Sequence, residues 1–174
     1  MPSLILTLIG PDRPGLVESV ATVVREQNAN WLESRMSHLA GHFAGIVRVD
    51  VADSDAEQLL DQLQSLESQG LTIVARRDDA PSDAEERTIV WMELVGNDRP
   101  GIVNEVSKAL ASQGVNVEEF QTECTGAPNS GASIFRANAA LGLPGSVTID
   151  DVQSALEAIA MDLMVDIKLA PDDD

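Results

Sequence analysis

The chain has 174 residues, of which 44% are hydrophobic, 23% are charged and 3% are aromatic, with no tyrosine. This composition is typical of a globular protein, whose core must here be built from Val, Ile, Leu, Met and Ala. Asp and Glu number 29 against 11 Lys and Arg, which gives a formal net charge of -18. Because nucleic-acid binding relies on basic side chains that neutralise phosphates, the charge argues against direct contact with DNA, RNA or an anionic membrane.

Two further protein classes are excluded by what the sequence lacks. Cys124 is the single cysteine, so neither an internal disulfide nor a thiolate-cluster metal site is expected. No stretch approaches the ~18 apolar residues of a membrane span, and the N-terminus lacks a basic region followed by an apolar run. We therefore expect a cytoplasmic protein.

Hydrophobic periodicity predicts the elements of the first half in the order strand, helix, strand, strand, helix, strand. The first turn reads GPDRPG, and Asp12 is the expected cap of a helix that Pro14 begins. The second helix is expected to be capped by Asp53-Ser54-Asp55 and to end at Gly70. The expected strands are 4–9, 31–39, 43–51 and 71–75, with a turn at Gly41 between the second and third.

The second half repeats the first. GPDRPG at 10–15 matches GNDRPG at 96–101, and the match continues at the same offset of 86 residues to the pairs Asn30/Asn116 and His38/Cys124. The offset later grows to 92 because a Gly- and Pro-containing loop, 125–131, is longer in the second copy. The elements predicted there are strands 89–95, 115–123, 132–141 and 163–169, with helices 100–113 and 150–161.

The fold class predicted from this repeat is α+β. It consists of two ferredoxin-like βαββαβ units, each an antiparallel sheet with its helices on one face. The predicted boundaries are 1–77 for the first unit, 78–87 for a polar linker, 88–170 for the second unit and 171–174 for an acidic tail. A unit of about 80 residues has a thin core, so we expect the units to pack on one another or on a second chain, as a homo-oligomer.

Each half resembles the ACT domain, a small regulatory module that binds amino acids. The resemblance rests on the βαββαβ order and on the turn x-G-x-D-R-P-G-[LI]-V, which both halves contain. Two such units with nothing attached are similar to the glycine cleavage system transcriptional repressor family, as is the segment ESRMSHLAGHFAG at 33–45. The resemblance implies a non-enzymatic regulator that binds an amino acid such as glycine or serine. It would act through a protein partner such as a transcriptional activator.

The two turns are the candidate ligand sites. Their glycines allow a close backbone approach, and the N–H groups and dipole at the helix start can hold a carboxylate. Asp12 or Asp98 could pair with the ammonium group of a free amino acid. The family's site also uses an Asn at the start of the second strand, where Asn30 and Asn116 stand. The candidate residues are therefore Gly10, Asp12, Arg13, Gly15 and Asn30, and their counterparts Gly96, Asp98, Arg99, Gly101 and Asn116.

Two alternatives to ligand binding stay open. In the first, the Asp side chains only cap helices and the Asn side chains only close turns, in an interaction module without a ligand. In the second, Arg13 or Arg99 forms the phosphate cradle of an acyl-phosphate hydrolase, although packing of the turn explains these residues more simply.

Other motifs favour neither an enzyme nor a cofactor, so no catalytic residue, cofactor or metal is predicted. Gly10 and Gly15 have the spacing of a P-loop, but Leu16 and Val17 replace its Lys-[Ser/Thr]. His38 and His42 supply only two ligands, fewer than a zinc site needs.

Overall fold

The computed structural model describes residues 3–78, 86–126 and 131–172. The chain divides into two compact units, Met1–Ser82 and Asp83–Asp174, and each is described by itself. Residues 79–85 of the predicted linker, 127–130 of the predicted loop and 173–174 of the predicted tail lie outside the described residues.

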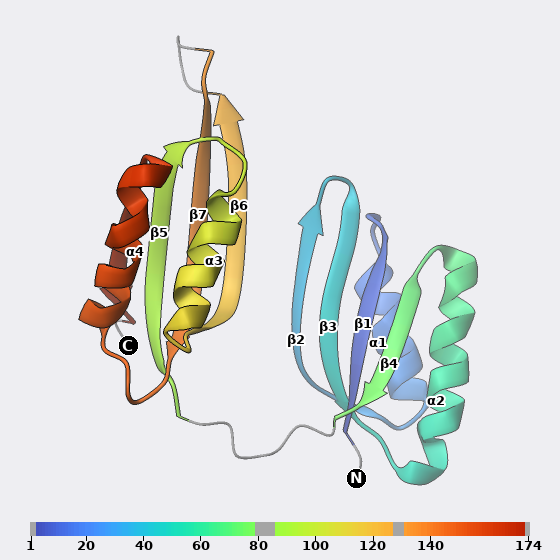
Figure 1. Ribbon diagram of the computed structural model, residues 1–174. Coiled ribbons are helices and arrows are strands. Elements are labelled where there is room, and N and C mark those ends of the chain that lie inside the picture. Colours follow the sequence, from blue (N-terminus) through green and yellow to red (C-terminus); the bar gives the residue numbers. More distant parts are fainter. Residues whose placement is uncertain (1–2, 79–85, 127–130, 173–174) are drawn as a thin grey trace. The chain divides into compact units, whose positions relative to one another are not determined.

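Unit 1 has the predicted βαββαβ order. Its elements are β1 (Ser3–Pro11), α1 (Leu16–Glu26), β2 (Asn30–Leu39), β3 (His42–Asp50), α2 (Asp53–Ser65), the 3-10 helix η1 (Leu66–Gln69) and β4 (Thr72–Arg77). The strands form one sheet in the order β2-β3-β1-β4, in which β1 runs antiparallel to β3 and β4. Both α-helices lie on the same face of this sheet (Figure 1).

Unit 2 has the same topology. Its elements are β5 (Thr88–Asn97), α3 (Ile102–Ser112), β6 (Asn116–Gly126), β7 (Ser133–Leu143), α4 (Ile149–Leu163) and β8 (Val165–Pro171). The sheet order is β6-β7-β5-β8, and α3 and α4 lie on one face (Figure 1). The two sheets confirm the predicted fold class.

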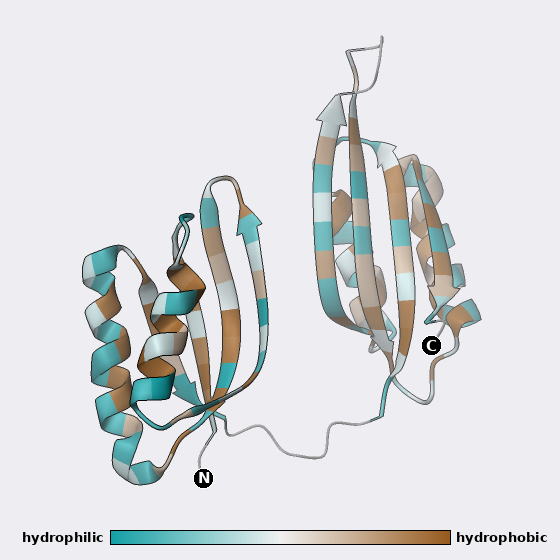
Figure 2. Cartoon of the chain, turned by 180° about the vertical axis from the view of Figure 1, so that it is seen from behind, coloured by the Kyte–Doolittle hydropathy of each residue, from teal (hydrophilic) through white to brown (hydrophobic). Residues whose placement is uncertain are grey.

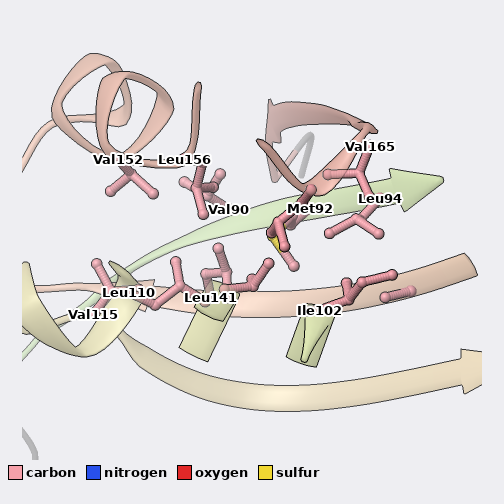
Figure 3. Close-up of a cluster of buried hydrophobic side chains, with 14 of the residues drawn as sticks. Val90, Met92, Leu94, Ile102, Leu110, Val115, Leu141, Val152, Leu156 and Val165 are labelled. Carbon is pink, nitrogen blue, oxygen red and sulfur yellow. The ribbon is translucent and has the colours of Figure 1, made fainter. Parts of the chain in front are cut away.

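Each core lies between a sheet and its two helices. Successive strand side chains point to opposite faces, so Leu4, Leu6 and Leu8 of β1 are buried while Thr7 and Ile9 are exposed. Hydrophobic and hydrophilic residues accordingly alternate along the strands (Figure 2). In unit 2, Val90, Met92 and Leu94 of β5 pack with side chains of the two helices (Figure 3). No polar side chain is buried in the described part of the chain, so apolar burial is the main stabilising contribution.

The caps predicted for α1 and α2 are wrong, and α3 lacks a side-chain cap as well. Helix α1 begins at Leu16 and α3 at Ile102, each two residues later than predicted, and neither N-cap makes a side-chain hydrogen bond. The N-caps are Gly15 and Gly101, whose φ angles are 88° and 100°. Glycine adopts this left-handed conformation without strain. The chain therefore enters each helix at the glycine, three residues after Asp12 or Asp98. Helix α2 is preceded by Ala52 and likewise lacks a side-chain cap.

Candidate ligand-binding site

Each strand–helix turn is fixed to the hairpin of its own unit. The backbone N–H of Asp12 donates to the carbonyl oxygen of Gly41 at 2.9 Å, in the turn between β2 and β3. The N–H of Asp98 donates to the carbonyl oxygen of Ser133 at 2.8 Å, at the start of β7. The turn, the first helix and the end of the hairpin therefore meet at one end of each sheet, where the predicted site residues are found.

Both units have a hollow at this meeting point. The hollow in unit 1 has a volume of about 290 Å³ and is lined by Asp12, Arg13, Gly15, Leu16, Val17, Glu18 and Phe43. The hollow in unit 2 has a volume of about 480 Å³ and is lined by Asp98, Arg99, Gly101, Ile102, Val103, Asn104, Ser107 and Phe135. Seven lining positions correspond between the two copies. Each hollow combines an acidic and a basic side chain, an apolar wall and the N-terminus of a helix.

Gly10 and Gly96 lie inside β1 and β5, beside the hollows but outside their lining. A Cβ on Gly10 would lie 2.7 Å from the carbonyl oxygen of Gly70, and a Cβ on Gly96 would lie 2.5 Å from Cγ1 of Val165. Both contacts are shorter than van der Waals separation allows, so these glycines are required for close packing of the sheet edge. The close approach that Gly10 and Gly96 allow is made to residues of the protein itself, Gly70 and Val165.

The two aspartates have different neighbours. In unit 1, a carboxylate oxygen of Asp12 lies 3.6 Å from Nε2 of His38 on β2. In unit 2, the carboxylate of Asp98 accepts a hydrogen bond from the thiol of Cys124 on β6. Desolvation, the negative charge of Asp98 and this hydrogen bond all raise the pKa of Cys124 above its ordinary value. The repeat pair His38/Cys124 thus faces the repeat pair Asp12/Asp98.

The two arginines also differ. Nη2 of Arg13 donates to the carbonyl oxygen of Gln69 at 3.1 Å and lies 3.4 Å from Oε1 of the same residue. Arg13 therefore joins the turn to the end of η1, in the packing role that the sequence suggested. Among the described residues, Arg99 has neither a hydrogen bond nor an ion pair, and its side chain lines the hollow of unit 2.

Asn30 and Asn116 are not brought to the turns of their own units. Asn30 pairs with Asp50, which pairs with Ser3 at the beginning of β1, whereas Asp12 follows the end of that strand. At ~3.3 Å per residue, the length of β1 separates them by roughly 30 Å. Asn116 lies at the corresponding end of unit 2, where its Nδ2 donates to Oε1 of Glu118 at 2.7 Å.

The apolar and variable residues that line the hollows were not among the predicted site residues. Phe43 and Phe135 form a wall in each copy, and Glu18 and Asn104 stand at the first turn of the helix. The repeat offset could have identified the second pair, because Glu18 and Asn104 are corresponding positions with different charge. In the described part of the chain, no group of three or more His, Cys, Asp or Glu could hold a metal ion. No helix in that part is long and apolar enough to cross a membrane.

Comparison with known proteins places the fold in a family. A family model for the ACT domain matches residues 3–76. Over 82 residues, which make up 45% of this chain and 91% of the relative, the chain is 32% identical to a UPF0237 protein of Methanopyrus kandleri. Unit 1 therefore matches the ACT domain family over nearly its whole length. Because unit 2 repeats the topology of unit 1, the chain consists of two ACT-like units in tandem.

Matches to known proteins also extend over almost the whole chain. It is 23% identical to the glycine cleavage system transcriptional repressor of Escherichia coli over 162 residues, which is 92% of this chain and 85% of the relative. The solved structure of an unknown protein from Galdieria sulphuraria has a TM-score of 0.86 and 30% sequence identity, and covers 98% of each chain. These matches confirm the resemblance inferred from the turns and the hairpin.

Proposed function

We propose that this tandem ACT protein is a non-enzymatic regulator that binds an amino acid and acts through a protein partner. Membership of the ACT family and the likeness to a glycine cleavage system transcriptional repressor support a regulatory, amino-acid-binding role. They favour a regulator over an enzyme. The finer parts of the proposal are glycine or serine as ligand, a transcriptional activator as partner, and action in the cytoplasm.

The observation that carries the proposal is the pairing of opposite charges in both hollows. A free α-amino acid carries an ammonium and a carboxylate group on the same carbon atom. Asp12 or Asp98 offers a partner for the ammonium group, and an arginine beside a helix N-terminus offers partners for the carboxylate. The apolar wall that includes Phe43 or Phe135 could contact the side chain of the ligand.

Charge supports action through a protein partner. Residues 1–87 contain 7 basic and 15 acidic residues, so the surplus of negative charge is shared by both halves of the chain. A surface of this kind repels DNA phosphates. Under this proposal, ligand binding changes the population of a conformation that a protein partner recognises.

Exposed apolar side chains on the open sheet face of unit 1, including Ile9, Ile46 and Val74, support association into a homo-oligomer.

One alternative function has specific support. The bond of Arg13 to Gln69 and the tight packing around Gly10 and Gly96 both explain turn residues without any ligand. In that case the protein is an interaction module whose turns serve stability alone.

Isothermal titration calorimetry separates these two functions. We expect the full chain to bind at least one of the twenty common amino acids at millimolar concentration or below, with glycine and serine tested first. The double variant Asp12→Ala/Asp98→Ala should lose this binding, because both ammonium partners are removed. The matched control Asp53→Ala/Asp150→Ala removes two carboxylates from other helix starts and should retain it. No heat of binding with any amino acid would favour the interaction module.

A further inference from the structure

The two hollows differ at one lining position in the first turn of the helix, Glu18 in unit 1 and Asn104 in unit 2. Glu18 lies in the first turn of α1, and its Oε2 is 3.9 Å from the place that a Cβ on Gly15 would take. The carboxylate of Glu18 therefore lies beside the N-terminus of α1, although it makes no capping hydrogen bond there. In unit 2 the corresponding residue is the uncharged Asn104, and no described atom lies within 4 Å of the place that a Cβ on Gly101 would take. The acidic residue in the first turn of α3 is Glu105, which pairs with Lys108 at 3.3 Å and does not line the hollow.

The arginines of the two hollows also differ, and the difference again favours ligand binding in unit 2. Nη2 of Arg13 donates hydrogen bonds to Gln69. If Arg13 moved to a ligand, these bonds would break and the turn would lose its connection to the end of η1. Arg99 lines the larger hollow without a partner among the described residues. When a guanidinium binds a carboxylate without first breaking other bonds, less of the binding free energy is offset by rearrangement.

The net charge of the lining gives a third difference. The hollow of unit 1 contains Asp12, Glu18 and one arginine, so its lining is negative overall. The hollow of unit 2 contains one acidic and one basic side chain, Asp98 and Arg99. An amino acid has equal and opposite charges, so it complements the hollow of unit 2.

We propose that the two ACT units are not equivalent and that the chain binds one α-amino acid, in the hollow of unit 2. Arg99 and the N-terminus of α3 receive the carboxylate, and Asp98 receives the ammonium group. The hollow of unit 1 keeps the same framework but serves to stabilise its turn. This assignment rests on the proposed amino-acid-binding function and adds to it the number of sites and their location.

The test introduces into unit 2 the charge that unit 1 carries. The full chain is titrated in a calorimeter with each of the twenty common amino acids, and we expect a stoichiometry of one per chain. Asn104→Glu should weaken binding at least tenfold, since two like charges a few ångströms apart at a protein surface repel by more than the ~1.4 kcal/mol that corresponds to tenfold. Ala111→Glu adds the same charge two turns further along α3 and should change affinity less than about twofold.

Nuclear magnetic resonance on the unaltered chain gives a second readout that depends on no variant. Ligand-induced shifts of backbone amides should gather on residues 101–107 and leave residues 15–19 unchanged. Two equal sites per chain, shifts centred on residues 15–19, or an Asn104→Glu variant that is folded and binds normally would each overturn the assignment. Those results would leave amino-acid binding itself intact, whereas no binding by the unaltered chain would overturn the proposed function.

Discussion

At the residue scale, the aspartates of the two turns show how a repeated framework can place different chemistry at the same point. Asp12 faces an imidazole and Asp98 faces a thiol, because His38 and Cys124 occupy the same place in the two copies. A thiolate is the reactive form of cysteine, and a neighbouring carboxylate disfavours it. Cys124 is exposed, so a reagent can reach the thiol, while its raised pKa limits the fraction that is thiolate.

We expect Asp98→Asn to make Cys124 more reactive. The substitution removes the negative charge that helps to raise the pKa of the thiol, so a larger fraction is thiolate at any pH below that pKa. The rate of alkylation by iodoacetamide at pH 8 should rise several-fold, and its pH profile should shift to lower pH. Asp12→Asn, the same change in the other unit, should leave the rate unchanged. An equal rate in both variants would contradict a role for Asp98.

At the element scale, α4 is the one α-helix among the described residues with a side-chain cap at its N-terminus. The hydroxyl of Thr148 accepts a hydrogen bond from the N–H of Asp151 at 3.2 Å, and the carboxylate of Asp151 accepts one from the N–H of Thr148 at 2.9 Å. These reciprocal bonds satisfy two N–H groups at the start of the helix. The side-chain and backbone hydrogen bonds from Thr148 lower the pKa of Asp151 below its ordinary value of 3.8.

We expect Thr148→Ala to reduce the free energy of unfolding of unit 2 by about 1 kcal/mol. Ser154→Ala, a matched change in the middle of α4, should change it by less than about 0.5 kcal/mol. Urea denaturation followed by Trp91 fluorescence in a Trp31→Phe background measures both. Because the pKa of Asp151 is lowered by folding, its contribution is present above pH 3.8 and is lost as pH falls through the folded-state value. The difference between the two variants should therefore shrink below pH 3.8.

Sequence periodicity was sufficient for the strands and helices but not for the helix starts or the site. The buried Leu and Val positions of β1 and α1 recur at the spacing of a strand and a helix, so local pattern and tertiary packing agree. The start of α1 depends on the left-handed conformation of Gly15, which one sequence does not reveal. The distance between Asp12 and Asn30 depends on the direction and register of β2. The sequence alone shows only that both are polar residues next to turns.

At the scale of the whole molecule, the two units have separate cores. One buried cluster contains residues of Leu4–Ile73 and the other contains residues of Val90–Val165. Each cluster includes its own sheet and both of its α-helices. Each unit therefore has a hydrophobic core built from its own described side chains.

We expect the fragments 1–82 and 83–174 each to fold alone. Each should give the circular dichroism of mixed helix and sheet and should unfold in one cooperative transition, with modest stability because domains of this size bury little surface. Thermal unfolding of each fragment beside the full chain provides the measurement. A fragment without a cooperative transition would show that its fold needs the rest of the chain.

Strand β6 lies at the edge of its sheet and exposes all of its side chains. An edge of eleven residues is a ready template for a strand from another molecule, and such pairing can extend into fibres. Glu118, Glu119 and Glu123 place negative charges along this edge. An incoming copy would bring the same carboxylates against them, and like charges on paired strands are destabilising. The acidity of the chain therefore also protects its longest open edge from self-templated aggregation.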